Sequence, residues 1–171
     1  MKFVLSSEPL RVEPVDAPAA GGFVTFEGRV RNHADGREVI GLEYEAYSEM
    51  AHAQGAALLS EAITRFGLTD ARAVHRTGKL MIGEVAVIVQ AASAHRREAF
   101  GACEWIMDQL KWRIPIWKRE TYADGVSDWV SAGAAPSMPE DQEMFIRQVR
   151  LREVGAIGQE RLSNARVLLV G

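Results

Sequence analysis

The chain has 171 residues, of which 47% are apolar and 25% are charged, and its formal net charge is −3. This composition is typical of a globular protein in water, and the net charge argues against a dedicated nucleic-acid binder. No apolar run approaches the roughly 18–20 residues that cross a bilayer, and the N-terminus lacks the apolar segment of a signal peptide. We therefore expect a cytoplasmic protein with no membrane and no nucleic-acid partner.

Cysteine and histidine usage excludes two further kinds of site. The single cysteine, Cys103, cannot form an internal disulfide, and its place on the apolar face of a predicted helix favours a buried packing thiol over a nucleophile. The four histidines are scattered along the chain, and no cysteine–histidine cluster has zinc spacing. No metal site is predicted.

The first part of the chain reads as strands joined by polar turns. Residues 2–5 predict an opening strand, and the prolines that follow exclude a long helix. Residues 23–31 alternate between apolar and polar side chains, as a half-buried strand does. Residues 39–47 alternate again after a polar turn, so the two strands predict a hairpin. The expected core-facing residues of the second strand are Ile40, Leu42, Tyr44 and Ala46.

A helix is predicted next, from Ser48 as its N-cap to about Phe66, with Gly67 as its left-handed C-terminal residue. Residues 71–80 read as a strand. Residues 84–92 are apolar almost throughout, which predicts a strand in the centre of a sheet. The helix residues available for burial are Met50, Ala53, Ala57, Leu58, Ile63 and Phe66.

A second helix is predicted within residues 93–121, with Ser93 as its N-cap and Pro115 just beyond its end. Residues 116–121 and 128–130 read as strands around a turn. This order of elements predicts an α+β fold with mostly antiparallel pairing and two main helices. The apolar face of the second helix comprises Ala99, Phe100, Cys103, Ile106, Met107 and Leu110.

Positive charge at the start of the second helix is unusual. His95, Arg96 and Arg97 occupy its first turn, where the helix dipole and the free N–H groups favour anions. These side chains are either solvated surface charges or the site of a phosphate or carboxylate.

Two lysines lie near the end of the same helix. Lys111 follows Met107 by one turn, and Lys118 lies on the next strand, so the helix end and the strand can bring both amines to one pocket. Crowding and partial burial would then yield a neutral amine that serves as acid, base or nucleophile. The alternative is a pair of surface charges compatible with the helix dipole. Arg31, which ends a strand before a tight turn, has the same two interpretations.

Five short motifs occur together in a specific order and spacing. They occupy residues 23–33, 42–47, 75–78, 93–96 and 117–120. Through them, residues 21–130 closely resemble the family of molybdopterin synthase large (catalytic) subunits. The resemblance implies an α/β-hammerhead-like fold and a homodimer. It also implies a small ubiquitin-like sulfur-carrier subunit at each end of the dimer, which gives a heterotetramer.

The reaction implied by this resemblance moves two sulfurs onto cyclic pyranopterin monophosphate and forms the dithiolene of molybdopterin. The sulfur donor is a thiocarboxylate at the Gly-Gly C-terminus of the small subunit. Lys111 and Lys118 match the catalytic lysines, with roles in proton transfer and in stabilising the acyl intermediate. The implied substrate-binding and pocket residues are Arg31, His95, Arg96, Phe26 and Met107. No metal or other cofactor is required, because molybdenum enters later in the pathway.

The resemblance further implies that His95 and Arg96 share one pocket with Lys111 and Lys118. Relatives often carry an arginine soon after the Trp-Val pair, where this chain has Ser-Ala-Gly at residues 131–133. Arg113 or Arg119 could substitute for that arginine.

The composition changes after residue 130. Residues 131–139 are rich in small residues and proline, as linkers are. Residues 140–171 resemble the start of an E1-like adenylyltransferase and stop at the first glycine of its nucleotide loop, so no adenylation is expected. We predict a large-subunit domain at 1–130, a linker at 131–139 and a truncated E1-like segment at 140–171.

A second hypothesis keeps the fold without the chemistry. The domain would then dock the sulfur carrier or dimerise a fusion enzyme without turnover, although the intact set of lysines and basic substrate residues argues against this. Binding of single-stranded nucleic acid is a third alternative, since tryptophans interleave with basic residues. These tryptophans are Trp105, Trp112 and Trp117.

Overall fold

The computed structural model describes residues 1–130, and the predicted linker and E1-like segment lie outside these described residues. The strands are β1 (Lys2–Ser6), β2 (Gly22–Arg29), β3 (His33–Ala34), β4 (Arg37–Ala46), β5 (Leu68–Arg76), β6 (Gly78–Leu80), β7 (Val85–Ser93), β8 (Ile116–Tyr122) and β9 (Ser127–Val130). The helices are α1 (Ser48–Phe66) and α2 (Arg96–Arg113). The predicted α+β class, with two main helices and mostly antiparallel pairing, is confirmed.

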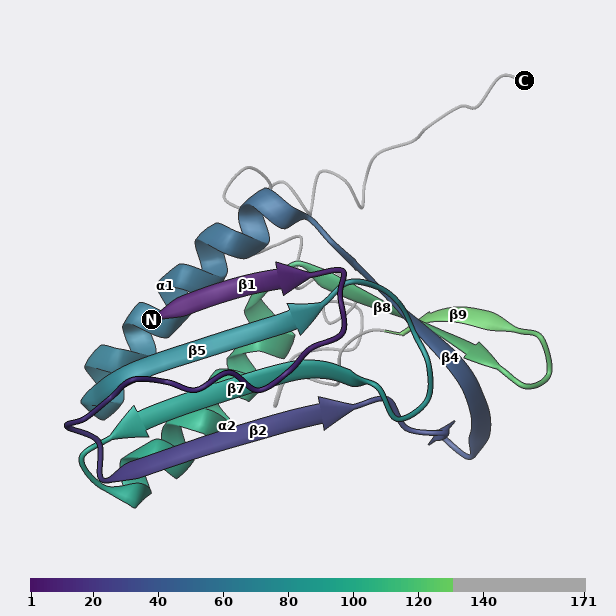
Figure 1. The fold of residues 1–171 in the computed structure, drawn as a ribbon. Coiled ribbons are helices and arrows are strands. Elements are labelled where there is room, and N and C mark those ends of the chain that lie inside the picture. Colours follow the sequence, from purple (N-terminus) through teal and green to yellow (C-terminus); the bar gives the residue numbers. More distant parts are fainter. Residues whose placement is uncertain (131–171) are drawn as a thin grey trace. The chain divides into compact units, whose positions relative to one another are not determined.

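The first sheet has the strand order β1-β5-β7-β2 and carries both helices on one face (Figure 1). β1 runs parallel to β5, whereas β7 runs antiparallel to β5 and β2 on either side of it. The inner place of β7 confirms the prediction of a central strand at residues 84–92. The core lies between this sheet and the helices, where Leu58, Leu59, Val89 and Ile106 are fully buried.

Helix α1 has the predicted ends, and part of its predicted face is confirmed. Leu58 is fully buried, and Ile63 and Phe66 are half-buried against the main core. The other buried residues, which were not predicted, are Ala51, Gly55, Leu59 and Ala62. Small side chains on this face let the helix approach the sheet closely, and Gly55 lies against the ring of Phe3. Gly67 has φ 62°, as predicted. The N-cap is Tyr47 rather than Ser48, and it makes no side-chain capping bond.

A methyl group at position 55 is expected to destabilise the protein. The Cβ added by Gly55→Ala would lie 2.2 Å from the ring of Phe3, closer than non-bonded atoms pack. Overpacking costs about 1–3 kcal/mol, whereas alanine gains at most ~1 kcal/mol over glycine inside a helix. Urea unfolding followed by circular dichroism should therefore give a lower free energy of unfolding than for the wild type.

Gly101→Ala in α2 is the matched control for this substitution. Its Cβ would meet the ring of Phe66 at 3.5 Å, an ordinary van der Waals distance. Helix propensity should dominate there, and the free energy of unfolding should rise by up to about 1 kcal/mol. Equal effects of the two substitutions would contradict the close packing of α1 on β1.

The second sheet has the order β3-β4-β8-β9, with β6 also beside β4. The predicted hairpin of residues 23–31 and 39–47 is wrong, because β2 pairs with β7 and β4 pairs with β8. The chain crosses between the sheets after β2, where Val30 exchanges backbone hydrogen bonds with Gly83 and Glu84. Residues that follow one another in sequence therefore belong to different sheets.

Two of the predicted strands differ from the structure in detail. The strand predicted at residues 71–80 is divided at Thr77 into β5 and β6, which lie in different sheets. In β4 the register with β8 shifts around Ile40, so Val39 is buried while Ile40 is 48% exposed, the reverse of the prediction. No helix among residues 1–130 is both long and apolar enough to cross a bilayer.

Candidate functional site

An apolar hollow of about 380 Å³ opens between β2 and α2. It is lined by Val24, Thr25, Phe26, Phe100, Cys103, Glu104, Met107 and Asp108. The structure thus brings together Phe26 and Met107, the two residues assigned to an apolar pocket. Phe100 was predicted on the buried face of α2 but is 62% exposed, and it lines the hollow instead. Glu104 and Asp108 add negative charge to an otherwise apolar lining.

Cys103 lies in the wall of this hollow as the buried thiol that the sequence predicts. The thiol is 4% exposed and donates a hydrogen bond to the Val89 carbonyl at 3.7 Å. Burial raises the pKa of the Cys103 thiol to about 11. A thiol with this pKa is almost wholly protonated at neutral pH and is a poor nucleophile.

We expect Cys103 to react slowly with iodoacetamide in the folded protein. A pKa of about 11 in place of 9.0 lowers the thiolate fraction at pH 7.5 about 100-fold, and burial restricts access further. The measurement is the alkylation rate by mass spectrometry, with the urea-unfolded chain as the control. Equal rates in the folded and unfolded chain would contradict the buried, protonated thiol.

A second cluster lies on the inward face of β8, where every other residue points the same way. The Lys118 Nζ donates to Glu120 Oε1 at 2.8 Å, and the Tyr122 hydroxyl donates to Glu120 Oε2 at 2.8 Å. Glu120 is 4% exposed, so both oxygens of a buried carboxylate have a donor. The Arg31 side chain is close enough to act on Glu120 electrostatically.

The charge state of Glu120 follows from these neighbours. Burial is the largest influence and raises the pKa of the carboxyl group. The hydrogen bonds from Lys118 and Tyr122, with the positive charges of Lys118 and Arg31, outweigh burial and hold the pKa below its ordinary value. Glu120 is therefore an anion at neutral pH and holds the Lys118 ammonium in place.

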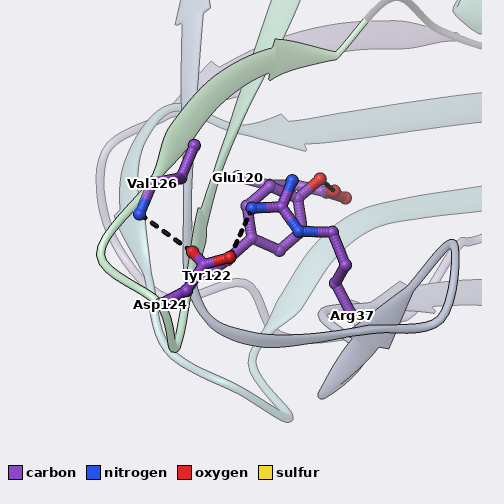
Figure 2. A network of polar contacts seen from close by, with 5 residues as sticks. All are labelled: Arg37, Glu120, Tyr122, Asp124 and Val126. Atoms are coloured by element: carbon purple, nitrogen blue, oxygen red, sulfur yellow. Dashed lines mark hydrogen bonds and ion pairs between the residues drawn. The ribbon is translucent and has the colours of Figure 1, made fainter.

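The network continues past Tyr122 to the turn between β8 and β9. The Arg37 guanidinium stacks 3.6 Å from the centre of the Tyr122 ring, and its Nη2 donates to Asp124 Oδ2 at 2.8 Å. Asp124 Oδ1 also accepts the Val126 backbone N–H at 3.0 Å. Figure 2 shows the Arg37 guanidinium over the Tyr122 ring, with Asp124 linked by dashed lines to Arg37 and to Val126.

Lys111 lies at the other side of the corner that leads into β8. It is exposed in the last turn of α2, one turn after Met107. The chain between α2 and β8 is anchored, because Ile114, Pro115 and Ile116 are all buried. This buried corner fixes the end of α2 relative to the strand that carries Lys118.

His95 and Arg96 lie at the opposite end of α2 from Lys111. Because α2 rises 1.5 Å per residue, the backbones of Arg96 and Lys111 are about 22 Å apart. One chain therefore does not bring the two pairs of residues into a single small pocket. Ser93 is not the N-cap as predicted: His95 occupies that position, and the Ser93 hydroxyl donates to the His95 carbonyl.

The backbone at this helix start is held against β2. A Cβ on Gly22 would lie 2.7 Å from backbone atoms of His95 and Arg96, so only glycine allows this approach. The side chains of His95 and Arg96 are both exposed. Among the described residues, no group of three or more histidine, cysteine, aspartate or glutamate side chains could hold a metal ion.

The MoaE protein family matches residues 5–113, which is more than half of the chain. The chain belongs to the MoaE family. A MoaE relative from Thermoplasma volcanium, named molybdopterin synthase catalytic subunit, is 46% identical over 118 residues. That alignment covers 69% of this chain and 86% of the relative.

Solved structures agree with the MoaE assignment. Molybdopterin synthase from Staphylococcus aureus superimposes with a TM-score of 0.68 and 34% identity, covering 75% of this chain and 95% of that one. A complex of subunits 1 and 2 of molybdopterin-converting factor from Helicobacter pylori has a TM-score of 0.57. It covers 70% of this chain and 78% of that chain, and at 22% identity it supports the fold alone.

Glu120, Tyr122 and Arg37 are the residues of this candidate site that the sequence analysis did not identify. Residues 117–120 served as a motif, yet Glu120 received no role. The available signal was the i, i+2 spacing from Lys118 through Glu120 to Tyr122, which places all three side chains on one face of a strand. Nothing in the local sequence indicates that this face is the buried one.

Proposed function

We propose that this chain is the catalytic subunit of a molybdopterin synthase and moves sulfur onto cyclic pyranopterin monophosphate. The observation that carries the proposal is the Lys118 ammonium held by a buried carboxylate beside Arg31. It occurs in a chain whose close relatives are named molybdopterin synthase catalytic subunits. The sulfur donor in this proposal is the C-terminal thiocarboxylate of a small ubiquitin-like subunit.

The proposed chemistry assigns different tasks to the two lysines. After the thiocarboxylate sulfur has bonded to the pterin, water adds to the acyl carbon of the small subunit, and negative charge develops on the carbonyl oxygen. The C–S bond then breaks, which leaves the sulfur on the pterin and a carboxylate on the small subunit. The Lys118 ammonium, held by Glu120, is a preorganised donor for that charge. Lys111, exposed at the end of α2, would transfer protons to and from the pterin. Arg31 would bind the substrate as an anion receptor.

The hollow between β2 and α2 suits the approach of the small subunit. Its lining is apolar at Phe26 and Met107, and Lys111 follows Met107 by one turn of α2. A Gly-Gly tail has no side chains, so it can pass through a narrow channel. The Helicobacter pylori structure, which resembles this chain in fold, is itself a complex of two subunits of molybdopterin-converting factor.

A homodimer follows from the proposed roles of His95 and Arg96. The roughly 22 Å between the two ends of α2 is too far for one chain to contact a single pterin with both sets of residues. A second copy would supply His95 and Arg96 to the pocket that holds Lys111 and Lys118. The heterotetramer proposed for this chain is such a dimer with two small subunits.

Binding of the small subunit tests the docking part of the proposal. Phe26→Asp places a charge in the apolar hollow and should weaken affinity at least about tenfold by calorimetry, because an unpaired buried charge is costly. Phe23→Asp is the matched control, since Phe23 is also exposed but points to the other face of β2. Equal affinities for all three proteins would contradict this docking site.

Turnover separates the proposal from its alternative, a docking module without catalysis. Both hypotheses predict that the small subunit binds. Only the enzyme converts cyclic pyranopterin monophosphate when the small subunit carries a thiocarboxylate. Tight binding without any dithiolene product would favour the docking module.

A further inference from the structure

We propose that Tyr122 is a positioning residue for sulfur transfer, held by Arg37 and Asp124, whose hydroxyl fixes Glu120 so that the other carboxylate oxygen faces Lys118. The inference rests on the proposed catalytic role of Lys118. The added element is a set of residues outside the pocket, Tyr122 with Arg37 and Asp124, that determines the position of the Lys118 ammonium group.

First, the two oxygens of the Glu120 carboxylate accept hydrogen bonds from two different donors. Oε2 accepts the Tyr122 hydroxyl and Oε1 accepts the Lys118 ammonium, each at 2.8 Å. A carboxylate can turn about its terminal bond, and that torsion has a broad energy well. With one oxygen fixed by Tyr122, the direction of the other oxygen is fixed as well.

The second step is the rigidity of the Tyr122 ring. Tyr122 is 5% exposed and packs with Ala34 and Val39 in a small core of the second sheet. Its backbone is tied to the β8–β9 turn, because the Tyr122 N–H donates to the Val126 carbonyl at 2.9 Å. The hydroxyl therefore has a fixed position relative to β8.

The third step is the clamp on the outer side of the ring. Arg37 lies over the ring at 3.6 Å and is tethered to Asp124, which also accepts the Val126 N–H (Figure 2). The hydrogen bonds from Val126 and Arg37 lower the pKa of Asp124, so it keeps its charge and its hold on Arg37 near neutral pH. The turn, the arginine and the tyrosine form one connected support for Glu120.

A purely structural role for Tyr122 makes a different prediction. A buried tyrosine needs an acceptor for its hydroxyl, and Glu120 could simply satisfy that need. Loss of the hydroxyl would then lower stability but leave the chemical step unchanged. The two readings are separated by the charge state of Glu120 and by the rate of sulfur transfer.

Tyr122→Phe is the test variant, because it removes the hydroxyl and keeps the ring under Arg37. Tyr47→Phe is its control, since Tyr47 is exposed and lies at the start of α1. Carboxyl ¹³C NMR should show the Glu120 titration at higher pH in Tyr122→Phe than in the wild type. The remaining charged or polar groups that face this carboxylate, Lys118 and Arg31, are the same in both proteins.

Single-turnover kinetics with thiocarboxylated small subunit and cyclic pyranopterin monophosphate provide the second readout. The rate constant should fall about five- to tenfold in Tyr122→Phe, which is less than the full effect of one hydrogen bond to a charged group because Lys118 still contacts Glu120, while KM for the pterin changes less than twofold. In a Glu120→Gln background the same change should add no further loss of rate, because Tyr122 acts through Glu120.

Either of two results would overturn the inference. One is an unchanged Glu120 titration in Tyr122→Phe, and the other is a wild-type rate constant in a folded Tyr122→Phe protein. The titration requires no turnover. A wild-type protein that makes no dithiolene would therefore refute the proposed function, while the titration would still decide whether Tyr122 controls Glu120.

Discussion

Replacing Lys118 with alanine is expected to lower the single-turnover rate of dithiolene formation by about 10²–10⁴-fold, the range for loss of a general acid or an oxyanion donor. The reason is specific to its position. Lys118 Nζ lies 2.8 Å from the buried Glu120 carboxylate, so the ammonium group is already positioned before the substrate binds. The measurement is product formation by quenched flow with saturating small subunit.

Lys79→Ala is the control for this experiment, because Lys79 is an exposed lysine on β6 away from β8's inward face. It should retain the wild-type rate. Lys118→Ala should still fold, as judged by circular dichroism, since the Lys118 side chain is 28% exposed and lies outside the main core. A folded Lys118→Ala protein with a rate within threefold of the wild type would remove Lys118 from the mechanism.

Glu120→Gln is expected to reduce both stability and turnover. It removes the negative charge between Lys118 and Arg31 and puts an amide where Tyr122 donates. Hydrogen bonds to charged groups are worth about 1.5–3 kcal/mol, so the free energy of unfolding at pH 7 should fall by roughly that amount. Sulfur transfer should fall at least about tenfold, because the Lys118 ammonium loses its anchor.

The pH dependence of this stability loss has a definite sign. The pKa of Glu120 is lowered from 4.5 in the folded chain, so its carboxylate contributes stability above the unfolded value. That contribution disappears as the pH falls through the lower, folded value. The stability difference between the wild type and Glu120→Gln should therefore be largest near pH 7 and shrink below about pH 4.5.

Urea unfolding at several pH values measures this difference. Glu38→Gln serves as the control, because Glu38 is exposed on β4 and should give a difference near zero at every pH. A gap between the wild type and Glu120→Gln that grew on acidification would contradict the assigned ion pair.

The sequence pattern predicted the positions of most helices and strands correctly, but it did not predict which strands pair. The ends of α1 and the central place of residues 84–92 follow from short-range periodicity and from Gly67, and the structure has them. The hairpin of residues 23–31 and 39–47 was wrong because adjacency in sequence does not decide strand pairing. Instead, β2 pairs with β7 and packs against α2.

The buried face of α1 shows a related limit. Hydrophobicity predicted Leu58 and Phe66, which do contact the core, but not Ala51, Gly55 and Ala62, which are buried because small side chains permit close approach to the sheet. Size complementarity with a partner such as Phe3 depends on the partner, which periodicity cannot identify.

The residues of the candidate site were also only partly predictable from the sequence. Family resemblance named Lys118, Arg31, Phe26 and Met107, and the structure places the first two around one carboxylate and the last two around one hollow. The anionic partner, Glu120, was missed because burial of one face of β8 depends on the distant β4. The sequence pattern correctly placed His95 at the start of α2 and Lys111 near its end, but the resemblance assigned both to one pocket despite the roughly 22 Å between the two ends of the helix.

The most direct test of the account is a reconstitution with three components. Purified chain, small subunit with a C-terminal thiocarboxylate and cyclic pyranopterin monophosphate are mixed under single-turnover conditions, and the pterin product is identified by mass spectrometry. We expect a product with two added sulfurs from the wild type and almost none from Lys118→Ala. Failure of the folded wild type to form any such product, although the small subunit binds, would contradict the assignment of catalysis to this chain.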